Sequence, residues 1–268
     1  MADIGSLLIL LLLGCASGLM AGFFGVAGGI VLIPFLLYYF QSTGVTSLVA
    51  THVTFGTSLV VMLFSSLASS YGYYRNSQIV WRAFLIIGLA SVVSAFGGSM
   101  LAGALEGKTL QRIFAVLVTF AAIRLLVDVR KPRGNPDPIL AVPGLAWTGL
   151  AVGFASSLAG VGGGVLSIPI MYSILHFPLK RAMGTSSATI VITALASAIG
   201  YTVSGWGNPL LPEGTLGYVD VLHSLPIILG TVPCAALGAH LAEKIGSSVL
   251  KKGFGFFLLA VATKMLFL

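Results

Sequence analysis

The chain has 268 residues, of which 57% are hydrophobic and 8% are charged, whereas a soluble chain carries about 25% Asp, Glu, Lys and Arg. This composition excludes an ordinary soluble domain. The net charge is +7, but the basic residues stand singly or in pairs beside apolar segments rather than in one patch, so we expect no nucleic-acid partner.

Apolar segments follow one another along the whole chain, in two sets of five. The first set covers residues 5–24, 29–40, 46–73, 79–104 and 109–128. The second set covers residues 144–160, 164–177, 183–204, 216–242 and 248–268. Many segments reach the roughly 20 residues that a helix needs to cross the hydrocarbon layer of a membrane. We therefore predict an all-α polytopic membrane protein; a β-barrel is the weaker alternative, because the segments lack its alternation of apolar and polar residues.

The first segment contains a leucine run followed by Gly14-Cys15, which resembles a lipoprotein cleavage box. A signal peptide opens with positive charge, whereas this chain opens with Asp3 and without Lys or Arg. We therefore expect the segment to remain as a membrane helix. Cys15 and Cys234 both lie inside apolar stretches, so they predict neither a disulfide framework nor a zinc site.

A glycine-rich motif occurs twice in the chain. Residues 25–34 are GVAGGIVLIP, and residues 160–169, located 135 positions later, are GVGGGVLSIP. A Gly-Thr-Ser step also occurs twice, at 56–58 and 128 positions later at 184–186. Self-similarity at about half the chain length is typical of membrane transporters that are built from two repeats.

The longest polar stretch predicts how the repeats are oriented. Residues 129–143 contain three basic residues and four prolines, and basic loops face the cytoplasm. With this cytoplasmic linker inside, a first transmembrane repeat at 1–128 and a second at 144–268 have inverted topology, because each contains an odd number of segments. The loop at 205–215 then lies outside. The other basic residues that then lie inside are Arg75, Arg82, Lys180, Arg181 and Lys244.

Segments 29–40 and 164–177 are too short to span a membrane, because as helices they rise only about 18 to 21 Å. Each begins at a glycine run and contains a proline, so we predict broken or re-entrant helices. Unpaired N–H groups at a helix start bind anions. Two such starts, related by inverted symmetry, would bind an anion at the midplane without a buried Lys or Arg. The predicted binding groups belong to Ala27, Gly28, Gly29, Gly162, Gly163 and Gly164.

The alternative interpretation of these glycines is that they only allow helices to pack closely. Two matched glycine runs ahead of short proline-containing segments favour the anion site. The Gly-Thr-Ser steps add four hydroxyl groups that we predict to donate to substrate oxygens. They belong to Thr57, Ser58, Thr185 and Ser186. Hydroxyl groups of this kind also bond the preceding helical turn or a neighbouring helix, which is the structural alternative.

His52 lies about one helical turn before the first Gly-Thr-Ser step. Ionisable side chains inside a membrane are candidates for function, so His52 is a candidate to relay a proton or to pair with the anion. We identify no counterpart of His52 in the second half, and this favours a structural residue near a helix end.

Several activities are not supported by the sequence. It has no cluster of Asp or Glu inside a segment of the kind that coordinates sodium or a metal, and no Walker motif for ATP hydrolysis. Paired carboxylates and His/Cys clusters at one depth are also missing, which argues against a membrane-embedded enzyme. We therefore expect no enzyme activity, no metal site and no cofactor.

In the two glycine motifs and the two Gly-Thr-Ser steps, the sequence resembles the TauE/SafE family of sulfite and organosulfonate exporters. The likeness covers nearly the whole chain. It implies a multi-pass permease of the plasma membrane, as in a bacterial inner membrane, for small anions such as sulfite, sulfoacetate or related sulfonates. Ala27 replaces the glycine that the second motif has at Gly162, so the two helix starts are unequal.

We therefore expect a secondary transporter in the lipid bilayer that exports such an anion by alternating access. Proton coupling and a homodimer are compatible with this expectation. The alternative is a non-transporting membrane scaffold or subunit of a larger complex, in which the glycines and serines serve only packing. That alternative predicts no affinity for anions.

Overall fold

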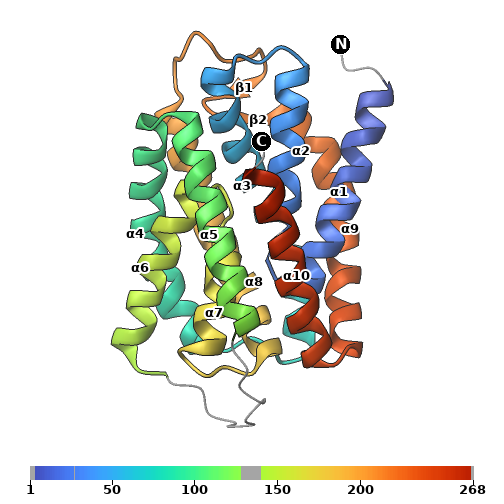
Figure 1. Cartoon of the computed structure of the whole chain (residues 1–268), viewed down its shortest axis with the longest axis vertical. Helices are drawn as coiled ribbons and strands as arrows, with labels where there is room; N and C mark the ends of the chain where they lie inside the picture. The colour runs from blue at the N-terminus through green and yellow to red at the C-terminus, as the bar shows by residue number, and fades with distance from the viewer. Residues whose placement is uncertain (1–3, 27, 128–139, 267–268) are drawn as a thin grey trace.

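The computed structural model describes residues 4–26, 28–127 and 140–266, and this part of the chain forms ten helices and one short hairpin (Figure 1). The helices of the first half are α1 (Ile4–Phe24), α2 (Gly29–Ser42), α3 (Ser47–Arg75), α4 (Trp81–Ala104) and α5 (Gly107–Val127). Those of the second half are α6 (Val142–Leu158), α7 (Gly164–Ser173), α8 (Leu179–Ser204), α9 (Val221–Lys244) and α10 (Ser247–Leu266). The prediction of an all-α polytopic protein is confirmed, with one helix for each apolar segment.

Within the part of the chain that the structure describes, five helices are long and apolar enough to cross a membrane, namely α1, α3, α4, α8 and α9. The helices α2 and α7 have only 14 and 10 residues, and α5 and α10 carry basic residues near their ends. The apolar composition and the helix lengths together establish a multi-pass membrane protein, as predicted.

One apolar segment is not wholly helical. The predicted segment 216–242 begins with a two-stranded antiparallel hairpin, formed by β1 (Thr215–Leu216) and β2 (Val219–Asp220), before α9 starts at Val221. Gly217, in the two-residue turn of the hairpin, has a φ of 56°, which a glycine adopts without steric cost. The second repeat also starts earlier than predicted, at Val142, while the rest of the linker up to residue 139 lies outside the described residues.

The two halves have inverted topology. The end of the molecule that carries β1 and β2 is the hairpin end, and the opposite end, where α5 finishes and α6 begins, is the linker end (Figure 1). Helix α1 starts at the hairpin end, whereas its equivalent α6 starts at the linker end, and every later helix of the second half is reversed in the same way. The inverted repeat predicted from the motifs is therefore confirmed.

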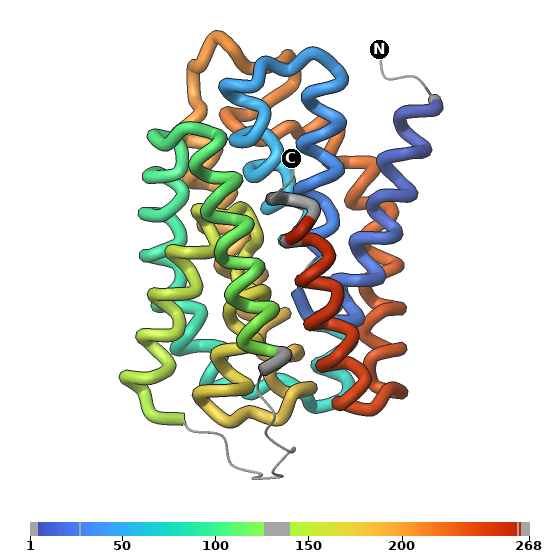
Figure 2. The backbone as a smooth tube through the Cα atoms, viewed as in Figure 1, coloured from blue at the N-terminus to red at the C-terminus, as the bar shows by residue number. Residues whose placement is uncertain are grey.

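The short helices complete re-entrant pairs. α1 and α2 enter from the hairpin end and return to it, and α6 and α7 enter from the linker end and return to it (Figure 2). The turn between α6 and α7 lies well inside the length of the bundle. Each half therefore places a glycine-rich turn and the start of a short helix inside the protein.

The two halves are packed into each other. α1 packs on α9, α6 packs on α4, and the largely buried helices α3 and α8 pack on each other in the centre. Glycines allow this close approach. A methyl group added to Gly14 would collide with the backbone of Ile227, and one on Gly149 would collide with that of Ile87. For these glycines, close packing is the correct interpretation.

Basic residues gather at the linker end. The residues at helix ends there are Arg75, Arg82, Lys180, Arg181, Lys244, Lys251 and Lys252. Lys108 and Arg112, which begin α5 at the hairpin end, and Lys264, near the end of α10, are the exceptions among the basic residues of the helices described here. These basic residues share the linker end in the structure. That this end faces the cytoplasm remains a prediction from the positive-inside rule.

Candidate functional site

The two short helices both start at a glycine in the left-handed conformation. Gly28 has a φ of 73° and precedes α2, and Gly163 has a φ of 111° and precedes α7. No side chain caps either start, although Ser, Thr, Asp or Asn usually does so. Gly29 and Gly164 open the helices, and these glycines and Gly162 are buried. Ala27 lies outside the described residues.

Each helix start leaves backbone donors without an acceptor in its own helix. The first intrahelical bonds of α2 are the N–H groups of Val31 and Leu32 to the carbonyl of Gly28. In α7 the equivalent bonds run from Leu166 and Ser167 to the carbonyl of Gly163. The preceding N–H groups therefore point out of the helix start, where the dipole is equivalent to about half a positive charge.

The two starts share one neighbouring side chain, Met62 on α3, and the start of α7 also approaches Ile190 on α8. Met62 lies against Gly29, and a methyl group on Gly162 would be 3.4 Å from its sulfur. The same methyl group would be 3.1 Å from Cγ2 of Ile190, and one on Gly164 would be 2.9 Å from Cδ1 of Ile190. The structure thus brings the predicted glycines of both halves together, with apolar side chains between them.

The threonines of the Gly-Thr-Ser steps have structural partners. Thr57 Oγ1 accepts the N–H of Asp220 at 2.9 Å, and Thr185 Oγ1 accepts the N–H of Val80 at 3.0 Å. Asp220 and Val80 are the N-cap residues of α9 and α4. Each threonine thus secures the start of a helix from the other half. Substrate binding by Thr57 and Thr185 remains a prediction.

The serines of the two steps are not equivalent. Ser58 Oγ lies 2.8 Å from the carbonyl oxygen of Phe55 and 2.9 Å from that of Gly160, which belongs to the turn between α6 and α7. Ser186 Oγ is fully buried and has no hydrogen-bond partner. An unpaired buried hydroxyl group is uncommon in a protein interior and calls for an explanation.

His52 has a counterpart that the sequence comparison missed. Its Nε2 lies 2.9 Å from the carbonyl oxygen of Leu105, just after α4. Lys180, which is 128 positions later, donates from Nζ to the carbonyl of Glu243 in the last turn of α9 at 2.6 Å. Both side chains therefore occupy a helix C-terminus, where basic groups are favourable. The expectation that His52 lacks a counterpart was wrong, because the equivalent residue is a lysine.

The other nitrogen of His52 is free of protein partners. Nδ1 is buried without a hydrogen-bond partner, and the ring stacks on Tyr218 at a centroid distance of 4.8 Å. Proton relay by His52 remains a prediction.

Two tyrosines were missed as candidate residues. Tyr73 and Tyr201 are fully buried and donate hydrogen bonds to the carbonyls of Gly22 at 2.8 Å and of Ser157 at 3.0 Å. Each therefore fixes the last turn of the helix that leads into a glycine-rich turn. Matched Gly-Tyr pairs at 72–73 and 200–201 were the available signal.

Acidic and metal-ligating side chains do not gather near the glycines. In the described residues, no three His, Cys, Asp or Glu side chains are placed to bind a metal. Asp220 pairs with His223, with Oδ2 and Nδ1 2.7 Å apart, and also accepts the N–H of His223 at the start of α9. The arrangement is that of a helix cap in which the capping carboxylate also contacts the imidazole of His223.

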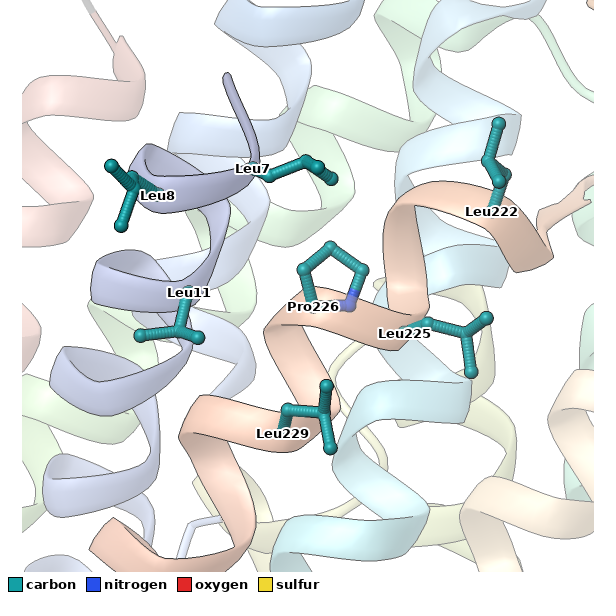
Figure 3. A pocket seen from close by; sticks show the side chains of 7 residues that line it. All are labelled: Leu7, Leu8, Leu11, Leu222, Leu225, Pro226 and Leu229. Atoms are coloured by element: carbon teal, nitrogen blue, oxygen red, sulfur yellow. The ribbon is translucent and has the colours of Figure 1, made fainter. Parts of the chain in front are cut away.

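A groove of about 480 Å³ lies between the first turns of α1 and α9 (Figure 3). Its lining consists of Leu7, Leu8, Leu11, Leu222, Leu225, Pro226 and Leu229. Most of these leucines are exposed, as side chains that face lipid are. The groove offers no polar group to an anion and is separate from the glycine-rich turns.

Comparisons with known proteins agree with the resemblance of the motifs. The family model for the sulfite exporter TauE/SafE matches residues 10–265. A relative from Haemophilus influenzae is 32% identical over 97% of both chains. A relative from Methanocaldococcus jannaschii is 27% identical over 91% of this chain and 89% of its own. Both carry the name probable membrane transporter protein. No solved structure matches this chain.

Proposed function

Because the chain belongs to the sulfite exporter TauE/SafE family, we propose that it is a secondary transporter that exports sulfite, sulfoacetate or a related sulfonate by alternating access. The coarser statement, that it is a membrane transporter and not an enzyme, follows from the family and from the names of its relatives. A multi-pass location in the plasma membrane follows in the same way.

The observation that supports an anionic substrate is the pair of buried, uncapped helix starts at Gly29 and Gly164. Both present backbone N–H groups and the positive end of a helix dipole to the region around Met62. Among the described residues, no Lys or Arg is buried. The helix starts are therefore the best available source of positive potential inside the bundle.

The inverted halves support alternating access. In transporters with such repeats, substrate binds at the repeat interface and one repeat moves against the other. In the present conformation Met62, with 0% exposure, lies between the helix starts, and Ile190, with 1% exposure, packs on the start of α7. We expect both side chains to move aside when the anion reaches the N–H groups.

Binding to the purified protein is the first test. Thermal stability is measured in the presence of sulfite, sulfoacetate, sulfate, acetate and chloride, because a ligand that binds the folded state raises its apparent stability. At a concentration 100 times the Kd, the expected stabilisation is about 2.7 kcal/mol. We expect a selective shift with sulfite or a sulfonate.

Anion efflux from liposomes then tests transport. A selective thermal shift with matching efflux would support the exporter, whereas no shift and no efflux with any of these anions would favour a scaffold. Gly164→Ala should block efflux, because its methyl group would lie 2.7 Å from Cα of Val26 at the helix start. Gly97→Ala is the matched control, since no atom of another element lies within 4 Å of the added methyl group.

A further inference from the structure

Contacts between the two halves occur in equivalent pairs. The bond from the N–H of Asp220 to Thr57 matches that from the N–H of Val80 to Thr185, and Tyr73 and Tyr201 make the matched bonds described above. The glycine-rich turns also follow this pattern. A methyl group on Gly160 would meet Phe55, and one on Gly25 would meet Met183. Phe55 and Met183 are 128 positions apart, as are the other equivalent residues of α3 and α8.

Next to the glycine-rich turns, one pair of equivalent contacts is broken. Ser58 follows Phe55 by one turn and bonds the carbonyl of Gly160 at 2.9 Å. Ser186 follows Met183, which packs on Gly25, by one turn, as Ser58 follows Phe55, yet its hydroxyl group has no partner. It also does not bond the carbonyl of Met183, whereas the single hydroxyl proton of Ser58 is shared between the carbonyls of Gly160 and of Phe55, the latter at 2.8 Å. The asymmetry lies next to the glycine-rich turns that lead into α2 and α7.

We propose that Ser58 and Ser186 act as alternating latches, that is, as two hydroxyl groups of which only one at a time bonds the glycine-rich turn of the other half. In the present conformation Ser58 makes this bond and Ser186 does not. In the opposite conformation Ser186 donates to the carbonyl of Gly25, while Ser58 releases Gly160. This inference rests on the alternating access of the proposed function. Each conformation then contains one latch bond and one free hydroxyl group, so the exchange adds no net cost in hydrogen bonds. Near-equal free energies of the two conformations are what an alternating transporter needs.

The two latches act at different ends of the molecule. α3 starts at the hairpin end, so Ser58 lies toward that end, whereas α8 starts at the linker end, so Ser186 lies toward that one. The bond from Ser58 to Gly160 therefore closes the hairpin end. In the opposite conformation, the bond from Ser186 to Gly25 closes the linker end and the hairpin end opens.

The test compares Ser58→Ala with Ser186→Ala, which remove the same atom from equivalent positions. A reporter cysteine replaces Val161, next to Gly160, after Cys15 and Cys234 have been changed to Ala. Val161 is 3% exposed in the present conformation, so a water-soluble thiol reagent reacts with the cysteine only when the hairpin end opens. The rate of labelling then measures how often the hairpin end opens.

The two substitutions should change labelling in opposite directions. Ser58→Ala weakens the present conformation, so labelling at Val161→Cys should rise about three- to tenfold, as expected for one net hydrogen bond. Ser186→Ala weakens the opposite conformation, so the same labelling should fall by a similar factor. Ser66→Ala is the matched control, because Ser66 Oγ bonds only the carbonyl of Leu63 in its own helix, and it should leave the labelling rate unchanged.

The latch would be overturned if Ser58→Ala and Ser186→Ala changed the labelling rate of Val161→Cys in the same direction, or if Ser186→Ala did not change it. Ser186→Ala removes no bond that is present in this conformation, so loss of folding does not obscure its result. Anion efflux is measured on the same variants. Efflux with unchanged labelling rates refutes the latch alone, and opposite rate changes without efflux support the latch while refuting the proposed substrates.

Discussion

Met62 is the side chain that reports most directly on the candidate anion site. It is fully buried, and it lies against Gly29 of one half and next to Gly162 of the other. If the two helix starts create a positive potential, a carboxylate at this position is stabilised by their N–H groups. If the glycines serve only packing, the same carboxylate is a buried unpaired charge and costs several kcal/mol.

The comparison of Met62→Glu with Met62→Gln separates these interpretations, since the two side chains have nearly the same shape. We expect the Glu variant to melt at the same temperature as the Gln variant or higher. We also expect sulfite to stabilise the Gln variant but not the Glu variant, whose carboxylate occupies the site. Thermal unfolding in detergent measures both effects. A Glu variant that melts far below the Gln variant would contradict an anion site at these helix starts.

At the scale of elements, the Gly-Thr-Ser step connects the two halves of the protein. Gly56 lies against the carbonyl of Tyr218, Thr57 accepts the N–H of Asp220, and Ser58 bonds the turn between α6 and α7. Three consecutive residues of α3 thus contact a hairpin, a helix start and a glycine-rich turn. The step is as much a docking motif as a candidate substrate site.

Removing the hydroxyl group of Thr57 should therefore lower the stability of the protein even when no substrate is present. Thr57→Val leaves the N–H of Asp220 unpaired and buried, at an expected cost of about 1–3 kcal/mol. Thr57→Ser keeps the hydroxyl group and should restore most of that stability. Unfolding of the two variants without any anion measures this difference. Equal stabilities, together with weaker sulfite binding in the valine variant only, would instead favour a direct role in substrate binding.

The helices were predictable because each is a long apolar run bounded by polar residues or glycine. The hairpin was not, since Leu216 and Val219 are apolar and extend the run that becomes α9. The glycine-rich helix starts were also predictable, from local sequence alone. The partners of Thr57 and Thr185 were not, because they are 163 and 105 positions away along the chain. The repeated sequence also does not predict that Ser58 bonds the other half while Ser186 has no partner. The two halves have equivalent sequences here but different arrangements in a single conformation.

At the scale of the whole molecule, each half buries its helix faces mainly against the other half. α1 packs on α9, α6 packs on α4, and α3 packs on α8, so the main interfaces of each half are formed with the other. The equivalent glycines at these interfaces, such as Gly18 against Thr231 and Gly153 against Ser91, leave no room for lipid between the helices. A half alone exposes these narrow, partly polar faces to the membrane.

A chain divided within residues 129–139 should therefore assemble only from both fragments. We expect each fragment alone to aggregate or to be degraded, whereas co-expressed fragments should purify together through a tag on one of them. The complex should bind sulfite and melt in a single transition close to that of the intact tagged chain, because the division leaves every described interface intact. A fragment that is monodisperse by itself would show that its five helices form a sufficient core. In that case the contacts of α1 with α9 and of α6 with α4 join two units that each fold independently. Movement of two rigid halves against each other would then be a simpler basis of transport than the exchange of latches in a shared core.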